Sequence, residues 1–452
     1  MPLDQCTLER MACAAEEGQR QAAAPRPPRI SFRLGAILRS RDFRLLWSGE
    51  AVSLLGDQFF LVALPWLVLQ LTGNAFAIGT VVAVAAAPRA IFILLGGALT
   101  DRFSPRFVML YSNVGRMVLV AILALLTATG VVELWMLYAF GLLSGFGSAL
   151  YLPAQSAMIP RLLPPDRLQT GNAVIQGTAQ LSLFLGPVLA GVLIALIGRA
   201  GAATAAVPDA TGIGVVLGFD AASFLASAAT LAMIRMPAVN GTDPSNARKN
   251  GVLRSIADGL AEVWRDKTLR YYFVLIGAVN LFLIGPVTVG IPILADTRFS
   301  GGALAFGTIL SALGAGAFVG VIAAGALRRP AGRSFAVAML GSCAMLGVGL
   351  ALLGALSSWG PAAAAAFLVG AAEGYLTVEF VTWLQLRTSP DELGRMMSML
   401  LFAAVGLAPL SNVAAGAVIQ VSAPLVMIGA GSLIVLVAVI AALSPSVWRL
   451  GD

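Results

Sequence analysis

Acidic side chains inside otherwise apolar segments are the first feature of this sequence that could do chemistry. Asp57 stands in "SLLGDQFFLVALPW" (53–66), which contains no Lys or Arg, and Glu373 and Glu379 stand in a second apolar segment. A charge at the centre of a bilayer costs about 2.5–3.5 kcal/mol on insertion scales, so an acid kept there needs a partner or a role. These acids are therefore candidates for carrying protons or contacting cargo.

Asp57 lies about 12 residues, roughly 18 Å at helical rise, from the start of its apolar segment, which places it near mid-membrane. A carboxyl group at that depth could exchange protons or contact substrate, or it could form a structural ion pair, and the residues leave both roles open. Arg89, which follows Pro88 in the next apolar segment, is the expected partner. If the two pair, neutralising Asp57 would free Arg89 and provide a switch.

The second acidic segment combines charge with aromatic rings. Glu379 is flanked at helical spacing by Tyr375 and Trp383, a face that suits a bulky organic cation. Glu373 lies about 120° away around the same helix, as helical geometry dictates. For both acids, pairing with another helix remains the alternative.

Composition places these residues in a membrane protein. Hydrophobic residues make up 58% of the chain, charged residues 11%, and the mean hydropathy is +0.88. The chain has no His, and its three Cys (Cys6, Cys13 and Cys343) are too scattered for a metal set or a disulfide framework. With no phosphate-binding Gly-rich loop either, the sequence predicts no metal, no cofactor and no enzyme activity, and an ion gradient as the driving force.

Segments of about 20 apolar residues, the length that spans a bilayer, recur twelve times and predict an all-α membrane fold. The expected spans are 45–70, 76–99, 106–129, 133–156, 170–197, 212–235, 271–295, 303–327, 334–356, 361–386, 395–420 and 423–447.

The basic residues fix the expected orientation. Alternate loops and the two termini hold 25 of the 29 Lys and Arg residues. Short cytoplasmic loops carry such an excess, so both termini are expected in the cytoplasm. The net charge of +7 then indicates contact with anionic lipid headgroups rather than with nucleic acid.

An internal duplication divides the twelve spans into two sets of six. Pro165-Asp166 and Pro390-Asp391 occupy equivalent loops, and "GALTDRFSPR" (97–106) corresponds to "GALRRPAGR" (325–333). The repeat predicts two six-helix bundles facing a central path, as in alternating-access carriers. The expected parts are a cytoplasmic, disordered tail (1–42), an N-terminal bundle (43–235), a linker with an amphipathic helix (236–270), a C-terminal bundle (271–447) and a short cytoplasmic tail (448–452).

Two motifs resemble signatures of the major facilitator superfamily. "GGALTDRFSPR" is similar to the family's loop signature between helices 2 and 3, Gly-x-x-x-Asp-Arg-x-Gly-Arg-Arg, and matches it at Gly97, Asp101, Arg102 and Arg106. Ser104 stands where the second Gly is usual. The resemblance implies a conformational latch in the first half of the chain.

"SLFLGPVLAG" is similar to the antiporter signature of exporters in that superfamily, with Gly186, Pro187 and Gly191 matching. Ordinary packing of small residues in membrane helices is the alternative interpretation. Longer segments of the chain, including the one that contains Gly56-Asp57, are similar to proteins of the branch that contains the enterobactin exporter and the macrolide and tetracycline efflux proteins. By that likeness Arg116 and Asp220 are expected to be structural residues outside the central path.

The resemblance implies a proton-coupled exporter of amphiphilic organic compounds, such as drugs, antibiotics or secondary metabolites, in a bacterial cytoplasmic membrane. Its expected partners are small substrates, protons and lipid, and a monomer is expected. A siderophore exporter or a lysophospholipid carrier is the nearer alternative, and a transport-inactive membrane sensor or scaffold is an alternative of another class.

Overall fold

The computed structural model describes residues 39–102, 104–164, 167–201, 209–235, 264–327, 332–388 and 402–448, with four isolated positions between these ranges. Within them, ten helices are long and apolar enough to cross a membrane, and two shorter apolar helices, Ala75–Arg89 and Ala408–Ile419, occupy the positions of the second and eleventh spans. The predicted all-α fold of twelve spans is therefore confirmed. Of the linker expected to hold an amphipathic helix, only residues 264–270 are described, and Trp264 among them is exposed.

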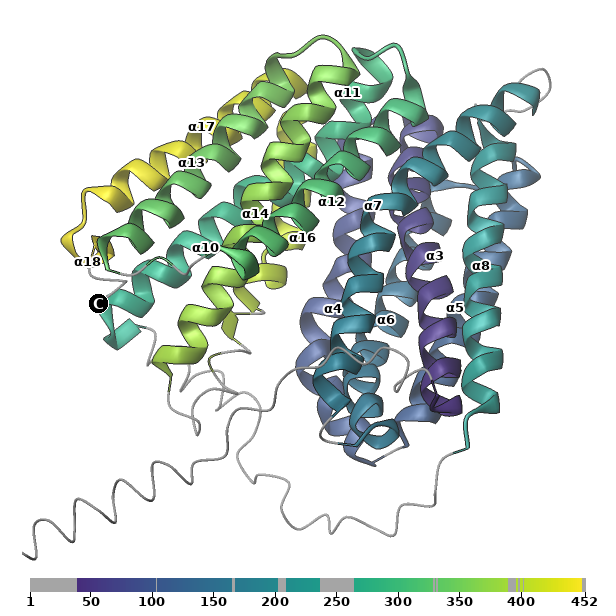
Figure 1. Cartoon of the computed structure of the whole chain (residues 1–452). Coiled ribbons are helices and arrows are strands. Elements are labelled where there is room, and N and C mark those ends of the chain that lie inside the picture. Colours follow the sequence, from purple (N-terminus) through teal and green to yellow (C-terminus); the bar gives the residue numbers. More distant parts are fainter. Residues whose placement is uncertain are drawn as a thin grey trace, which may run out of the picture.

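The first half forms a bundle of six helices (Figure 1). These are α3 (Arg41–Thr72), α4 (Ala75–Arg102), α5 (Pro105–Ala128), α6 (Leu134–Leu162), α7 (Leu168–Gly201) and α8 (Ala210–Met233). The residue types at the turn between α3 and α4 account for its conformation. Gly73 adopts the left-handed conformation (φ 61°) that ends α3, and the Asn74 carboxamide accepts the Phe76 N–H at 2.8 Å to start α4.

The second half repeats this arrangement. Its helices are α10 (Lys267–Gly285), α11 (Ile291–Thr297), α12 (Gly302–Ala326), α13 (Arg333–Ala355), α14 (Trp359–Arg387), α16 (Ala408–Ile419) and α17 (Ala423–Ala442), followed by the short α18 (Pro445–Trp448). A π-helical segment, Pro286–Gly290, joins α10 to α11, so the expected span 271–295 is one interrupted helix. Pro286 lacks an N–H and cannot complete the regular ladder, which accounts for the irregularity.

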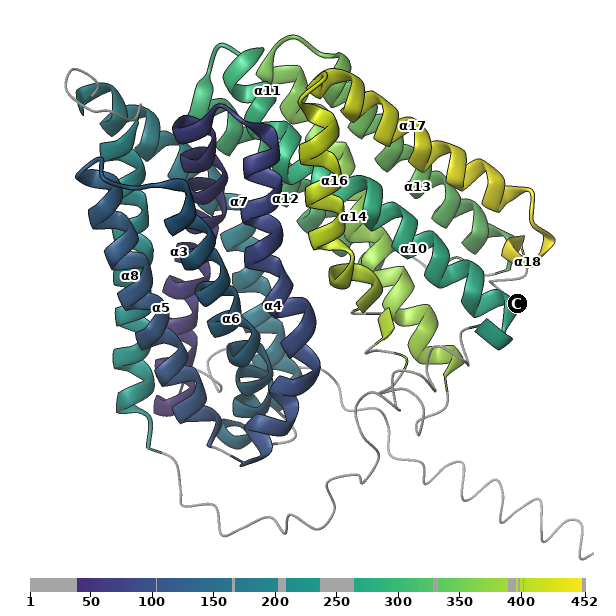
Figure 2. The same ribbon diagram turned by 180° about the vertical axis from the view of Figure 1, so that it is seen from behind.

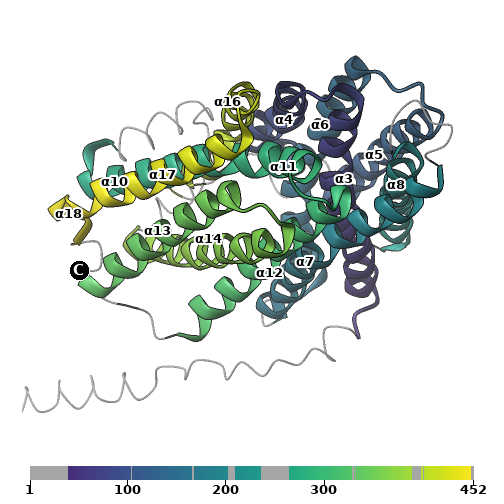
Figure 3. The same ribbon diagram turned by 90° about the horizontal axis from the view of Figure 1, so that it is seen from above.

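Helix pairing is the same in both halves. The second and fourth helices of each half pack together (α4 with α6, α12 with α14), as do the third and sixth (α5 with α8, α13 with α17). Between the halves, the second helix of one packs against the fifth of the other: α4 with α16, and α12 with α7 (Figure 3). This twofold pattern is what the predicted pair of six-helix repeats requires.

The two bundles meet near the end of the molecule where α3 ends, here called the closed end, and diverge toward the opposite end (Figures 1 and 2). At the closed end Gln70 donates to Asp296 at 3.3 Å, and Gln420 donates to Asn74 at 2.9 Å. Each bond joins one bundle to the other. The structure thus has one end tied by inter-bundle hydrogen bonds and the other spread apart.

Candidate functional site

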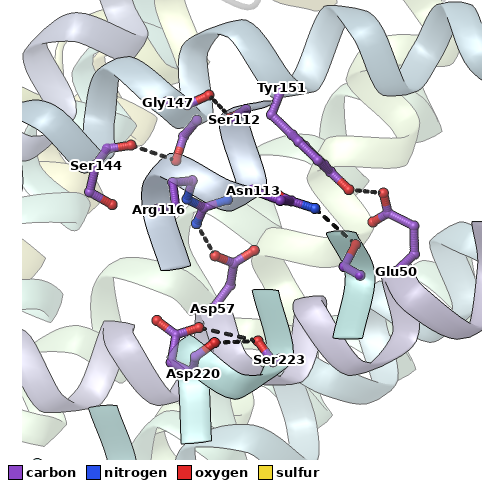
Figure 4. Close-up of polar contacts among 12 residues, drawn as sticks. Glu50, Asp57, Ser112, Asn113, Arg116, Ser144, Gly147, Tyr151, Asp220 and Ser223 are labelled. Carbon is purple, nitrogen blue, oxygen red and sulfur yellow. Dashed lines mark hydrogen bonds and ion pairs between the residues drawn. The ribbon is translucent and has the colours of Figure 1, made fainter. Parts of the chain in front are cut away.

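An ion pair lies at the middle of α3. Asp57 Oδ1 accepts a hydrogen bond from the guanidinium of Arg116, which extends from α5 (Figure 4). The Arg116 side chain is 7% exposed and that of Asp57 35% exposed. Asp57 is the seventeenth of the 32 residues of α3, which agrees with the depth expected from the sequence. A buried cation therefore holds a carboxylate that remains partly accessible.

Small residues and one ring make room for this pair. A Cβ at Gly147 of α6 would lie 2.9 Å from the Arg116 Cγ, so the stem of the arginine passes where any other residue would collide. The guanidinium carbon lies 4.0 Å from the centre of the Phe224 ring of α8, a favourable cation–π distance. Arg116 is thereby fixed by an apolar stem contact, a ring and one carboxylate.

The identity of the partner corrects the sequence-based expectation. Arg116, assigned a structural role, is the residue that binds Asp57, and the expected ion pair between Asp57 and Arg89 is absent from the described contacts. Arg89 is exposed on α4, although close enough to interact electrostatically with Asp57. The reason is packing around Arg116: the space beside Gly147 and the ring of Phe224 direct its guanidinium to Asp57, while on α4 Pro88 and Ala85 pack against Gly145 of α6.

A second polar layer lies about two helical turns, roughly 10 Å, from Asp57 toward the start of α3. There Tyr151 of α6 donates its hydroxyl to Glu50 Oε1, and Asn113 of α5 donates to Ser227 of α8 at 2.9 Å. All four side chains are buried, and Glu50 is 2% exposed. Sequence reasoning missed Glu50 because it stands close to the start of its span. The seven-residue spacing from Asp57, which places both acids on one helix face, was the available signal.

Replacing Tyr151 with Phe should destabilise the protein by about 1–3 kcal/mol, because Glu50 Oε1 would stay buried without its donor. Unfolding of the detergent-solubilised protein, followed by thermal or denaturant titration, measures the change. Tyr111→Phe is the matched control, since Tyr111 is 71% exposed. Equal stability of both variants would show that the Tyr151 hydroxyl contributes nothing.

The acidic and aromatic face of the C-terminal bundle is largely packed. Glu379 and Trp383 are 3% and 5% exposed, while Tyr375 and Glu373 are half-buried. Trp383 stacks on Tyr272 of α10 at 4.5 Å between ring centres, and the Tyr272 hydroxyl donates to the Phe380 carbonyl. In this arrangement the rings of Trp383 and Tyr272 join α14 to α10.

The expected latch is described only at its last residue. Gly97, Asp101 and Arg102 lie in α4, and their side chains are outside the described set. Arg106 donates to the carbonyls of Leu231 and Ala232 at 2.8 and 2.7 Å. It thus adds hydrogen bonds to carbonyl groups in the last turn of α8, where backbone donors are few.

The antiporter-like motif of α7 (Gly186, Pro187 and Gly191) contacts two helices, α12 of the other bundle and α3 of its own. A Cβ at Gly191 would lie 2.5 Å from the carbonyl oxygen of Ala303 in the other bundle, and one at Gly186 would lie 2.4 Å from Gln58 Cβ of α3. Just after Pro187, the N–H of Val188 donates to Ser311 Oγ of α12 at 2.7 Å. These residues place the backbones of α7 and α12 in direct contact across the two halves.

Two relatives with known names match the chain, one over most of its length and one over about half. Macrolide efflux protein A of Streptococcus pyogenes is 21% identical over 362 residues, 79% of this chain and 84% of the relative. The multidrug efflux pump Tap of Mycolicibacterium fortuitum is 27% identical over 220 residues, 48% of this chain and 50% of the pump.

Solved structures show the same fold at lower identity. The nucleoside transporter NupG superposes with a TM-score of 0.69 at 13% identity, over 88% of this chain and 98% of that one. A bacterial homologue of the lysosomal transporter Spinster gives a TM-score of 0.65 at 14% identity, over 89% and 95% of the two chains.

The family match is the broadest of these findings. Residues 46–410, from the first span into the eleventh, match the Major Facilitator Superfamily. The two repeated six-helix bundles and the relatives agree with it. The chain belongs to the major facilitator superfamily and is a multi-pass membrane transporter rather than an enzyme.

Proposed function

We propose that this transporter exports amphiphilic organic compounds, drugs or secondary metabolites, in exchange for protons across a bacterial cytoplasmic membrane. The names of two relatives, a macrolide efflux protein and a multidrug efflux pump, support the cargo class. The concentration of 25 of the 29 basic residues in the termini and alternate loops supports placing both termini in the cytoplasm. The end where the bundles diverge then faces the cytoplasm.

The observation that carries the proposal is the Asp57–Arg116 pair at the middle of α3. Asp57 is the partly accessible member, so a proton or a cationic cargo could reach it, while Arg116 is held from behind by Phe224. Neutralising Asp57 removes the charge that balances a buried guanidinium. Binding of a proton or a cationic cargo at Asp57 is thereby linked to the packing of α3 against α5 and α8. A carrier that couples proton movement to transport needs such a link.

Alternating access supplies the transport step. The inter-bundle bonds at the closed end, together with the spread of the opposite end, correspond to an inward-open arrangement. The Spinster homologue was likewise solved facing inward. Export requires the reverse state, in which α4 and α7 separate from α16 and α12 at the closed end. Arg89, Glu373, Glu379, Tyr375 and Trp383 remain the candidates for cargo contact.

Asp57→Asn should abolish proton movement driven by cargo, because an amide keeps the shape of the carboxylate but cannot take up a proton. Purified protein in liposomes with an internal pH dye, given erythromycin or ethidium as cargo, measures it. The variant should match protein-free liposomes. The exposed Glu133→Gln, at the residue before α6 and outside the bonds that join the bundles, is the control and should keep proton movement.

Two outcomes would contradict the proposal. Unchanged proton-coupled transport by Asp57→Asn would remove Asp57 from the coupling step. If the wild-type protein moves neither probe, nor a siderophore or lysophospholipid, under any imposed gradient, a role as membrane sensor or scaffold would gain support instead.

A further inference from the structure

A second acid adjoins the ion pair without a cation of its own. Asp220 of α8 is fully buried, at 0% exposure. Ser223 Oγ lies 3.5 Å from its Oδ1, and its Oδ2 has no hydrogen-bond partner among the described residues. An orphaned carboxyl oxygen in a protein interior is expensive, so its presence calls for an explanation.

The packing of α3 on α8 brings Asp220 to Asp57. A Cβ at Gly56 would lie 2.6 Å from Asp220 Oδ1, so this carboxyl group rests against the backbone next to Asp57. In Figure 4, Asp57 lies between Arg116 and Asp220. Both Asp57 and Arg116 act electrostatically on Asp220. The two adjacent residues Gly56 and Asp57 therefore have different roles. Gly56 leaves space for the Asp220 carboxyl group of α8, and Asp57 binds the Arg116 guanidinium.

The charges around Asp220 do not balance when every acid is ionised. From α3 the facing groups are Asp57 and, one layer away, Glu50, and from α5 the facing group is Arg116. The described side chains of α7 at 168–198 include no titratable group. Arg89 of α4 acts electrostatically on Asp57 and Arg116, but it is not among the charged groups that act on Asp220. Around Asp220 two carboxyl groups thus share one guanidinium, and a single bound proton makes that trio neutral in surroundings where an unbalanced charge is costly.

We propose that Asp57, Asp220 and Arg116 form one proton-binding site, in which a single proton is shared between the two carboxyl groups. In one state of the proposed site Arg116 pairs with Asp57, as in the structure, and the proton is on Asp220. The proton then passes from a carboxyl oxygen of Asp220 to one of Asp57, whose accessible side releases it, while Arg116 stays protonated throughout. This inference deepens the proposed proton coupling and rests on it for its physiological role.

Infrared spectroscopy of the purified protein tests the site without transport. Aspartate labelled with carbon-13 in the side-chain carboxyl separates these groups from Glu50, Glu373 and Glu379. Near neutral pH the wild type should show a protonated aspartate carbonyl band, which both Asp220→Asn and Asp57→Asn should lose. In the first variant the remaining carboxylate pairs with Arg116. In the second, Arg116 is the remaining charged group that acts on Asp220 among the described residues, and it favours the ionised form of Asp220.

Two controls and three contradicting results define the test. Ser223→Ala and Asp209→Asn, which leave all three groups in place, should keep the band. A band that persists in Asp220→Asn or in Asp57→Asn, or no such band in the wild type, would overturn the shared site. If Asp220→Asn fails to fold, the labelled Asp57→Asn protein alone decides. If the infrared bands behave as expected but no cargo drives proton movement, the shared site stands and the proposed function is refuted. If cargo drives proton movement but the bands do not behave as expected, the proposed function stands and the shared site is refuted.

Discussion

Arg116→Met is expected to destabilise the protein by about 2–4 kcal/mol, the range for removing one partner of a buried pair, reduced because Asp57 is 35% exposed. The change leaves Asp57 and Asp220 without their cation and removes the contact with Phe224. Met fills the space beside Gly147 with a chain of similar length, which limits cavity effects. The fall in unfolding free energy or in Tm of the detergent-solubilised protein measures it.

The double variant Asp57→Asn with Arg116→Met is the matched test of this explanation. It restores charge balance, so most of the lost stability should return, and the two changes should be strongly non-additive. The exposed Arg89→Met should change stability little, since Arg89 makes no ion pair with Asp57. If Arg89→Met were as damaging as Arg116→Met, the assignment of the Asp57 partner would be wrong.

Gly191→Val is expected to abolish transport while the protein still folds, because the new side chain would strike the backbone of the opposite bundle. The Cβ would lie 2.5 Å from the Ala303 carbonyl oxygen and 3.1 Å from the Gly307 Cα, and backbone atoms cannot rotate aside. The bundles should then separate at the closed end. Spin labels placed at Asn74 and Gln420, which are hydrogen-bonded across that end, would report a longer distance.

The control for this variant lies on the same helix. Gly177 of α7 has no atom within 4 Å of its added Cβ, so Gly177→Val carries the same loss of helix propensity without the collision. It should keep both transport and the wild-type label distance. An unchanged distance in Gly191→Val would show that α7 and α12 can adjust locally, and that this contact does not hold the closed end together.

Much of the fold follows from the sequence because a bilayer imposes simple rules. Runs of about 20 apolar residues have to cross it as helices, and all twelve expected spans correspond to helices in the structure. Hydropathy could not predict where a helix departs from regular α-helical geometry. The π-helical segment at 286–290 arises from Pro286 and from the hydrogen bond that Gly285 N–H donates to Ser411 of α16, a contact between distant segments.

Some features of the candidate site could likewise be predicted from the sequence, and others depend on contacts between helices. The depth of Asp57 could be counted along one helix, since rise per residue is fixed. Asp220 was visible as an intramembrane acid, but its place beside Asp57 depends on the α3–α8 contact at Gly56. Glu50 could have been found from its seven-residue spacing to Asp57, although its donor Tyr151 lies on another helix.

The sequence by itself determined the membrane class, the twelve spans, the duplicated halves and an acid at mid-depth of the first span, because these depend on local hydrophobicity and helical rise. Only the tertiary structure decided which arginine meets that acid. Arg89 and Arg116 both lie inside spans, and helical periodicity says nothing about how neighbouring helices are rotated toward each other. The space at Gly147 and the ring of Phe224 direct Arg116 to Asp57, while Arg89 forms no ion pair with Asp57 among the described contacts.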